Sequence, residues 1–316
     1  MKKTYALLIC VAVVAALTFW LASRPQPQES QARFAASFYP LAFLLGRLTD
    51  EAVYQVTPSG VEPHDYEASP QDILRLREMD LFVYNGAGLD VWAERLQTNF
   101  TDARVMSLNM IETLESGGVG LRGVSEEDRH EDEADEEEEH GDIDPHFWLD
   151  PIFMGVAVNQ LVETVAALEP AEKTRLVKNA DALNAELSAL DEEYRNGLRA
   201  CRLNTIVVLH DAFGYLADRY GFKIISISGL SPEQQPSARH LGELASLVRE
   251  QGIQYVFFET LVSPKLSETL ASEAGAQTLV LNPIEGLTSE DRAEGKNYFV
   301  LMRENLRHLR LAMDCQ

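Results

Sequence analysis

Residues 170–200 read PAEKTRLVKNADALNAELSALDEEYRNGLRA, and this stretch decides how the rest of the chain is organised. Between Leu176 and Leu198, apolar residues recur every three or four positions, which is the spacing of one face of an α-helix. Pro170 suits the first turn of such a helix, and thirty helical residues would span about 45 Å. Flexible linkers are rich in glycine, serine or proline, and this stretch has almost none. We therefore predict a rigid linking helix over residues 171–200.

The chain on either side of this helix repeats one pattern, in which short β-like runs alternate with helical segments. Such alternation is typical of a parallel sheet covered by helices. We predict an α/β fold with two lobes, residues 31–170 and 201–316, each with a four-stranded, mainly parallel sheet. The runs that we expect to form strands are Arg33–Phe38, Ala52–Thr57, Leu81–Tyr84, Arg104–Leu108, Thr205–Leu209, Lys223–Ile227, Gln254–Phe258 and Gln277–Leu281.

Residues 1–30 are expected to lie outside the fold. Lys2 and Lys3 give a positive start, Tyr5 to Ala22 is uncharged and mostly apolar, and a proline-containing linker follows. This pattern indicates a signal peptide or an N-terminal membrane anchor. Eighteen apolar residues fall between a signal core and a spanning helix, so both alternatives stay open. Either one places the rest of the chain in the periplasm or on the outer face of the cytoplasmic membrane.

The exported part contains two cysteines, Cys201 and Cys315. In an oxidising compartment two cysteines can form a disulfide. A bridge over more than a hundred residues would stabilise the fold by roughly 4–5 kcal/mol in the chain-entropy model. We expect this disulfide, and two unpaired thiols are the alternative.

An acidic run containing histidine lies in the loop 125–143. From Glu126 to Asp144 there are thirteen carboxylates and one arginine, with His130 and His140 among them. The run supplies -12 of the net charge of -23. Because no basic cluster balances it, a nucleic-acid partner is excluded. Blocks of like charge are usually solvated loops, so we treat both histidines as weak, accessory metal ligands.

Three of the seven histidines follow predicted strands or turns where ligands usually bind. His64 follows the second strand of the first half, and His146 follows the acidic run in Asp144-Pro145-His146-Phe147-Trp148. His210 ends the first strand of the second half. Ligands of open α/β sheets bind beyond the carboxyl ends of strands, and three imidazoles with a fourth position make a tetrahedral zinc shell. We therefore predict a site for a divalent metal ion between the two lobes.

These motifs also give the chain a resemblance to the solute-binding proteins of zinc and manganese ABC importers, and specifically to the zinc branch. The resemblance runs from about residue 33 to residue 314. It implies two α/β lobes joined by a rigid helix, with one metal ion in the cleft. The segments that carry it are Phe38–Leu41, Gly60–Pro70, Tyr84–Leu89, Asp144–Pro151, His210–Tyr215 and Leu301–Leu306.

The resemblance implies that His64, His146 and His210 are three of the metal ligands. Manganese binders of the family tend to have glutamate at the third place, so His210 indicates zinc. The family's fourth ligand is usually an aspartate, where this chain has Asn282. The fourth position is then expected to be water, a loop side chain or Glu259, with Asn282 and Glu259 as weak candidates.

The resulting prediction is an extracytoplasmic protein that captures Zn²⁺ and delivers it to an ABC transporter membrane permease driven by a cytoplasmic ATPase. We expect a monomer, not an enzyme. The alternatives are a manganese carrier, a metal-dependent surface adhesin on the same fold and, less favoured, a zinc hydrolase that uses Glu259 as its base.

Overall fold

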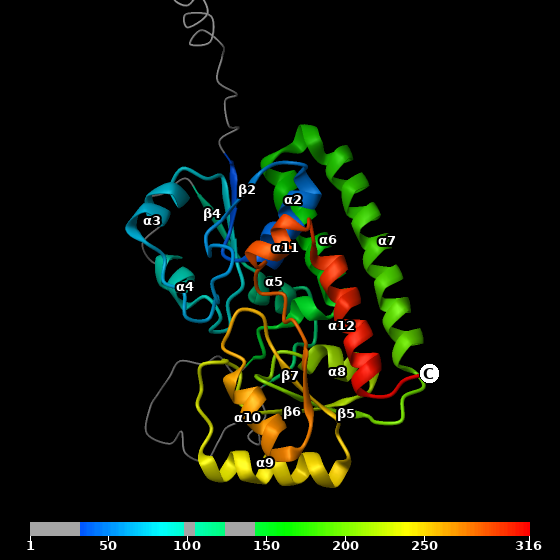
Figure 1. Ribbon diagram of the computed structural model, residues 1–316. Coiled ribbons are helices and arrows are strands. Elements are labelled where there is room, and N and C mark those ends of the chain that lie inside the picture. The colour runs from blue at the N-terminus through cyan, green and yellow to red at the C-terminus, as the bar shows by residue number, and fades with distance from the viewer. Residues whose placement is uncertain (1–31, 98–104, 124–142) are drawn as a thin grey trace, which may run out of the picture. The chain divides into compact units, whose positions relative to one another are not determined.

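The computed structural model describes residues 32–97, 105–123 and 143–316 (Figure 1). The predicted export segment and nearly all of the acidic run, including His130 and His140, lie outside these residues. Within them are two four-stranded sheets in which every strand pairing is parallel. The predicted α/β class with two parallel sheets is confirmed.

The first sheet has the strand order β2-β1-β3-β4. Its central strand β3 is fully buried and reads LFVY, the continuous apolar run expected of a strand covered on both faces. Ser37, just after β1, donates its N–H to the carbonyl of Val83, which extends the pairing beyond β1. The strands are β1 (Phe34–Ala36), β2 (Val53–Gln55), β3 (Leu81–Tyr84) and β4 (Met106–Asn109).

The second sheet repeats the same topology in the order β6-β5-β7-β8. In each sheet the second strand pairs with one edge of the first strand, and the third strand pairs with its other edge. The strand order therefore reverses direction beside β1 and beside β5. This reversal is the position at which open α/β sheets bind ligands. The strands are β5 (Thr205–Val208), β6 (Lys223–Ser226), β7 (Tyr255–Phe258) and β8 (Gln277–Val280). All eight predicted strands are present, within three residues at each end.

Helices connect and cover the strands, and several begin with the caps that their sequences specify. Asp150 accepts hydrogen bonds from the N–H groups of Ile152 and Phe153 at the start of α6, and Ser69 and Asp72 form a capping box on α3. The helices are α2 (Tyr39–Thr49), α3 (Pro70–Leu76), α4 (Val91–Gln97), α5 (Met110–Ser116), α6 (Pro151–Leu168), α7 (Lys173–Leu198), α8 (Gly214–Tyr220), α9 (Ala238–Gln251), α10 (Lys265–Ala274), α11 (Ser289–Ala293) and α12 (Tyr298–Ala312).

The predicted linking helix is α7, the longest helix of the described residues. It packs against α6, α2 and α12, which lie beside it in Figure 1. Near its start, Asn179 donates to the carbonyl of Leu48 in α2; near its end, the Tyr194 hydroxyl donates to the carbonyl of Met302 in α12. The helix therefore contacts elements from both ends of the chain, as expected of a rigid strut.

Helix α6 was not anticipated from the sequence. By length and composition it is the one helix of the described residues that could cross a membrane. A core helix passes the same test, and α6 buries Met154, Leu161 and Val165 in the main hydrophobic core. That core is continuous through α2, α6, α7 and α12, and smaller clusters cover the outer face of each sheet.

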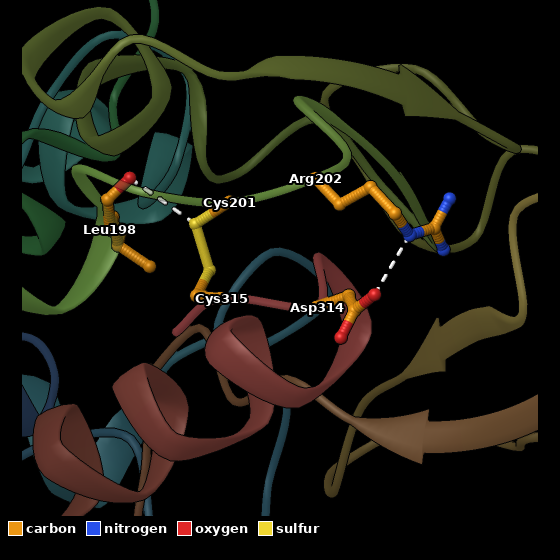
Figure 2. The surroundings of a disulfide bond; sticks show 5 residues. All are labelled: Leu198, Cys201, Arg202, Asp314 and Cys315. Carbon is orange, nitrogen blue, oxygen red and sulfur yellow. Dashed lines mark hydrogen bonds and ion pairs between the residues drawn. A yellow bond between two sulfur atoms is a disulfide. The ribbon is translucent and has the colours of Figure 1, made fainter.

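The predicted disulfide between Cys201 and Cys315 is present (Figure 2). It joins Cys201, three residues after the end of α7, to Cys315, three residues after the end of α12. Beside it, Arg202 donates to the Asp314 carboxylate at 2.7 Å. The disulfide thus links the ends of α7 and α12 covalently.

Candidate metal centre

Four side chains from four separate loops meet at one point. His64 lies in the loop after β2, and His210 follows β5 by two residues. His146 caps a 3₁₀ turn, Phe147–Leu149, that leads into α6. Glu285 lies in the loop after β8. Each of the four offers one ligand atom, and these atoms all lie within 4.8 Å of one another.

The separations between the ligand atoms match a tetrahedral metal shell. The Nε2 atom of His146 is 3.4 Å from that of His64 and 3.3 Å from that of His210. The Oε1 atom of Glu285 lies 3.4 Å from the Nε2 atoms of His64 and His210 and 3.5 Å from that of His146. A tetrahedron with Zn–ligand bonds of about 2.0–2.1 Å has edges of about 3.3–3.4 Å. These four atoms are therefore already spaced to hold one zinc ion.

Two of the imidazoles are oriented by carboxylates on their other ring nitrogen. Nδ1 of His146 lies 2.8 Å from Oδ1 of Asp144, and Nδ1 of His210 lies 2.7 Å from Oε1 of Glu259. A carboxylate at Nδ1 holds the proton there and leaves Nε2 free to bind a metal. Both imidazoles and both carboxylates are buried.

The loop that carries Glu285 is held in a strained conformation by its neighbours. Ile284 has φ of 60°, which a β-branched residue adopts only where surrounding contacts enforce it. The side-chain oxygen of Asn282 accepts the N–H of Ile284 at 2.7 Å, and Asn305 bonds the backbone of Asn282 through both its amide atoms. Trp148 donates its indole N–H to the carbonyl of Pro283 at 2.7 Å. These contacts fix the direction of the Glu285 side chain.

The imidazoles differ in their electrostatic surroundings. Burial by itself lowers the pKa of each of them, because it disfavours the charged ring. For His64 burial outweighs the attraction of Glu285 and lowers the pKa to about 4. For His146 and His210 the nearby carboxylates outweigh burial, and the pKa is raised, at His210 well above its usual value.

Glu285 is a buried carboxylate without hydrogen bonds in the described part of the chain. Burial alone raises its pKa, but the three imidazoles outweigh burial and hold the pKa of Glu285 well below its usual value. Burial and the charge of Glu285 together raise the pKa of Glu62 to about 10. A buried, ionised carboxylate that lacks hydrogen bonds is costly unless a cation lies beside it, so this geometry favours a bound metal ion.

The structure thus brings together the three predicted histidines, but with Glu285 in the fourth position. Asn282 uses its side-chain oxygen within the loop, and Glu259 orients His210; neither belongs to the four-residue group. Glu285 was not predicted because the resemblance pointed to Asn282 for the fourth position. The strand-end rule that selected the histidines also selects the loop after β8, and Glu285 is the only carboxylate between Leu281 and Thr288.

Fold and site together define a class of protein: two parallel α/β halves joined by a long helix, with a buried three-histidine, one-carboxylate metal centre. The chain matches the family model "Zinc-uptake complex component A periplasmic" over residues 35–312 and belongs to this family.

The most similar relatives carry names that refer to zinc. The chain is 34% identical over 316 residues to the zinc-binding lipoprotein AdcA of Streptococcus pneumoniae, covering 99% of this chain and 62% of that protein. It is 35% identical over 272 residues to the high-affinity zinc uptake system protein ZnuA of Bacillus subtilis, covering 85% of this chain and 84% of that protein. The chain therefore spans less than two thirds of the length of AdcA.

Solved structures with the same fold include a zinc-bound one. The Zn(II)-bound ZnuA-like domain of Streptococcus pneumoniae AdcA is similar with a TM-score of 0.73 and 33% identity, over 89% of this chain and 98% of that chain. The laminin-binding protein Lmb of Streptococcus agalactiae, described as bifunctional with adhesin and metal-transporting activity, is similar with a TM-score of 0.75 and 30% identity, over 89% and 98%.

Proposed function

We propose that the protein binds one Zn²⁺ ion through His64, His146, His210 and Glu285 and hands it to a membrane permease for uptake. The observation that carries the proposal is the set of 3.3–3.5 Å separations between the four ligand atoms. These five separations match the edges of a zinc tetrahedron, about 3.3–3.4 Å. Zinc is here the cargo of the protein.

The donor set favours zinc over manganese. Three imidazole nitrogens and one carboxylate oxygen in a tetrahedral arrangement suit Zn²⁺, whereas Mn²⁺ prefers more oxygen ligands in an octahedral one. The side-chain oxygen of Asn282 accepts the N–H of Ile284 within its own loop. An octahedral Mn²⁺ site would require two ligands beyond the four that this group supplies.

Transport is supported over catalysis by the number of protein ligands. Catalytic zinc sites keep one position for water or substrate, and four protein ligands leave none. Glu259, the residue that a hydrolase would use as a base, is already paired with His210 at 2.7 Å. The family description adds a zinc-uptake complex and a periplasmic location. We therefore propose a non-enzymatic, exported carrier, with an ABC-type permease as its partner.

Three further assignments complete the proposal. The N-terminal lobe comprises residues 31–170, the linking helix residues 171–200 and the C-terminal lobe residues 201–316. The protein acts as a monomer, because one complete metal centre is built from a single chain.

The test is a competition titration with a zinc chelator on the wild type and on Glu285→Gln, which removes the charge and keeps the shape. We expect one tight zinc site in the wild type and a loss of affinity in the variant, with a preference for Zn²⁺ over Mn²⁺ in both. Asn282→Asp is the matched comparison, since it adds a carboxylate at the other candidate position and keeps the shape of the side chain. Undiminished zinc affinity in Glu285→Gln would refute Glu285 as a ligand, and tighter binding of Mn²⁺ would refute the choice of metal.

A surface adhesin is the second candidate, because Lmb shares this fold and is described as having both activities. Binding of the zinc-loaded and metal-free protein to immobilised laminin separates the candidates. Laminin binding that is retained while a strain lacking the protein grows normally in low zinc would favour the adhesin.

A further inference from the structure

Arg122 and Asp144 lie on the two sides of the segment 124–142, which contains most of the acidic run. The N–H of Asp144 donates to the carbonyl of Arg122 at 2.9 Å, and Gly123 and Ile143 form an antiparallel bridge. These backbone contacts hold the two ends of the segment side by side. They also fix the position of the Arg122 backbone, from which the side chain extends.

The guanidinium of Arg122 joins two aspartates from different halves of the chain. Its Nη1 atom lies 3.1 Å from Oδ2 of Asp144 and 3.1 Å from Oδ2 of Asp211. The Asp144 side chain is fully buried, and that of Asp211 is 6% exposed. A cation between two buried carboxylates offsets part of the cost of burying their charges and holds them close to each other.

Each of these aspartates is next to a metal ligand. Oδ1 of Asp144 accepts the backbone N–H of His146 at 2.9 Å and orients the ring at 2.8 Å. Asp211 directly follows His210 in the chain. The guanidinium is thus linked to His146 through the carboxylate of Asp144, and to His210 through its neighbour in the chain, Asp211. It contacts neither imidazole ring directly.

The start of α8 provides the space that Arg122 occupies. A Cβ atom at Gly214 would lie 2.0 Å from Nη1 of Arg122 and 2.8 Å from Oδ2 of Asp144. The hydroxyl of Tyr215 accepts the N–H of Arg122 at 3.1 Å and donates to the carbonyl of Asp144 at 2.8 Å. Only glycine at position 214 leaves room for the guanidinium between the two carboxylates.

We infer that Arg122 is a positioning residue of the zinc site: by bridging Asp144 and Asp211 it fixes His146 relative to His210 and couples both to the base of the acidic run. The inference rests on the proposed ligand set. Outer groups that orient metal ligands typically contribute about 10–100-fold to metal affinity. Because Arg122 acts on two ligands through their neighbours, we expect its loss to weaken zinc binding by about tenfold, chiefly through faster dissociation.

The experiment compares Arg122→Gln, Arg122→Lys and Gly214→Ala with the wild type, using the full chain in a mild detergent. Three quantities are measured: the rate of zinc dissociation into excess chelator, the visible absorption spectrum of the Co²⁺-loaded protein, and the thermal unfolding of the metal-free protein. Arg122→Gln and Gly214→Ala should dissociate zinc faster and alter the Co²⁺ spectrum, and Arg122→Lys should recover part of both.

Arg219→Gln is the matched control. Arg219 also pairs across the halves, with Asp150 at 2.5 Å, and is similarly buried, but Asp150 does not contact a metal ligand. Its loss should lower the unfolding temperature and leave zinc dissociation and the Co²⁺ spectrum unchanged. If Arg122→Gln behaved like Arg219→Gln in all three measurements, the inference would be overturned.

His146→Ala separates a failure of this inference from a failure of the ligand set. Retained tight zinc in His146→Ala would refute the ligand set itself. Lost zinc in His146→Ala together with wild-type dissociation in Arg122→Gln would refute only the role of Arg122. Should Arg122→Gln not fold, Gly214→Ala gives the decision, since it displaces the guanidinium and keeps its charge.

Discussion

The first half of the chain contributes His64 and His146 to the candidate metal centre, whereas the second half contributes His210 and Glu285. Both halves use the same order of strands, and three of the four ligands lie in loops that follow a strand, whereas His146 lies before α6. The first half thus offers two imidazoles, and the second offers one imidazole and the only carboxylate. The shared topology determines where metal ligands can lie. The sequence of each loop determines which type of ligand it supplies.

One ligand of the first half, His64, is held less firmly than the other three. Glu259 orients His210, and Asn282 and Asn305 brace the loop of Glu285, so both ligands of the second half are fixed. In the first half, Glu62 accepts only the backbone N–H of His64, whose side chain is 8% exposed. His64 is thus the most exposed of the four proposed ligands.

The largest effect on zinc binding is expected from loss of a buried ligand in either half. His146→Ala and His210→Ala should each weaken zinc binding by more than about 100-fold, because loss of a ligand exceeds the 10–100-fold effect of an outer group. Competition with a chelator of known affinity measures this. His308→Ala is the control, since His308 bonds the carbonyl of Val280 and does not belong to the four-residue group. If either half could lose its ligand without effect, the two halves would not share one site.

A smaller effect is expected from the carboxylates that orient these two imidazoles. Asp144→Asn and Glu259→Gln keep the size of the side chain and remove its charge, and each should weaken zinc binding by about 10–100-fold. The same titration measures both. Equal losses would show that the two halves orient their buried histidines alike; a loss in only one would show that the other ring is held by packing.

Removal of the disulfide should change stability and leave the metal centre almost unaffected. Both cysteines belong to the second half, and the bridge closes a sequence separation of 114 residues. Replacement of Cys201 and Cys315 by serine should lower the free energy of unfolding by roughly 4–5 kcal/mol in the chain-entropy model. Denaturant unfolding of the metal-free protein measures this.

Arg202→Gln is the matched control for the disulfide variant. It removes the exposed ion pair with Asp314 beside the bridge (Figure 2) and should cost no more than about 1 kcal/mol. A large drop in zinc affinity in the double serine variant would mean that the bridge also shapes the centre.

The smallest effect is expected from deletion of residues 126–142, most of the acidic run. All four proposed ligands and the Arg122–Asp144 contact lie outside the deleted segment. The variant should keep one tight zinc site and lose only weakly bound ions, which equilibrium dialysis at several zinc concentrations distinguishes. Loss of the tight site would show that the acidic run supplies ligands to it, with His130 and His140 as the candidates.

Much of the architecture was predictable because its signals are local. Buried parallel strands such as β3 read as continuous apolar runs, and α7 has the regular apolar spacing of a helix with one buried face. Helix α6 escaped notice because it is apolar on most of its surface, so the alternation between a buried and an exposed face is weak.

The sequence by itself determined the two parallel sheets, the linking helix, the disulfide partners and the three histidines, since periodicity, residue type and position at strand ends express all of these. Only the tertiary structure decided that Glu285, and not Asn282 or Glu259, completes the group. It also decided that Arg122 joins the two aspartates beside the ligands. The physical reason is that the direction of a loop side chain depends on contacts between residues far apart in the chain, which no local pattern records.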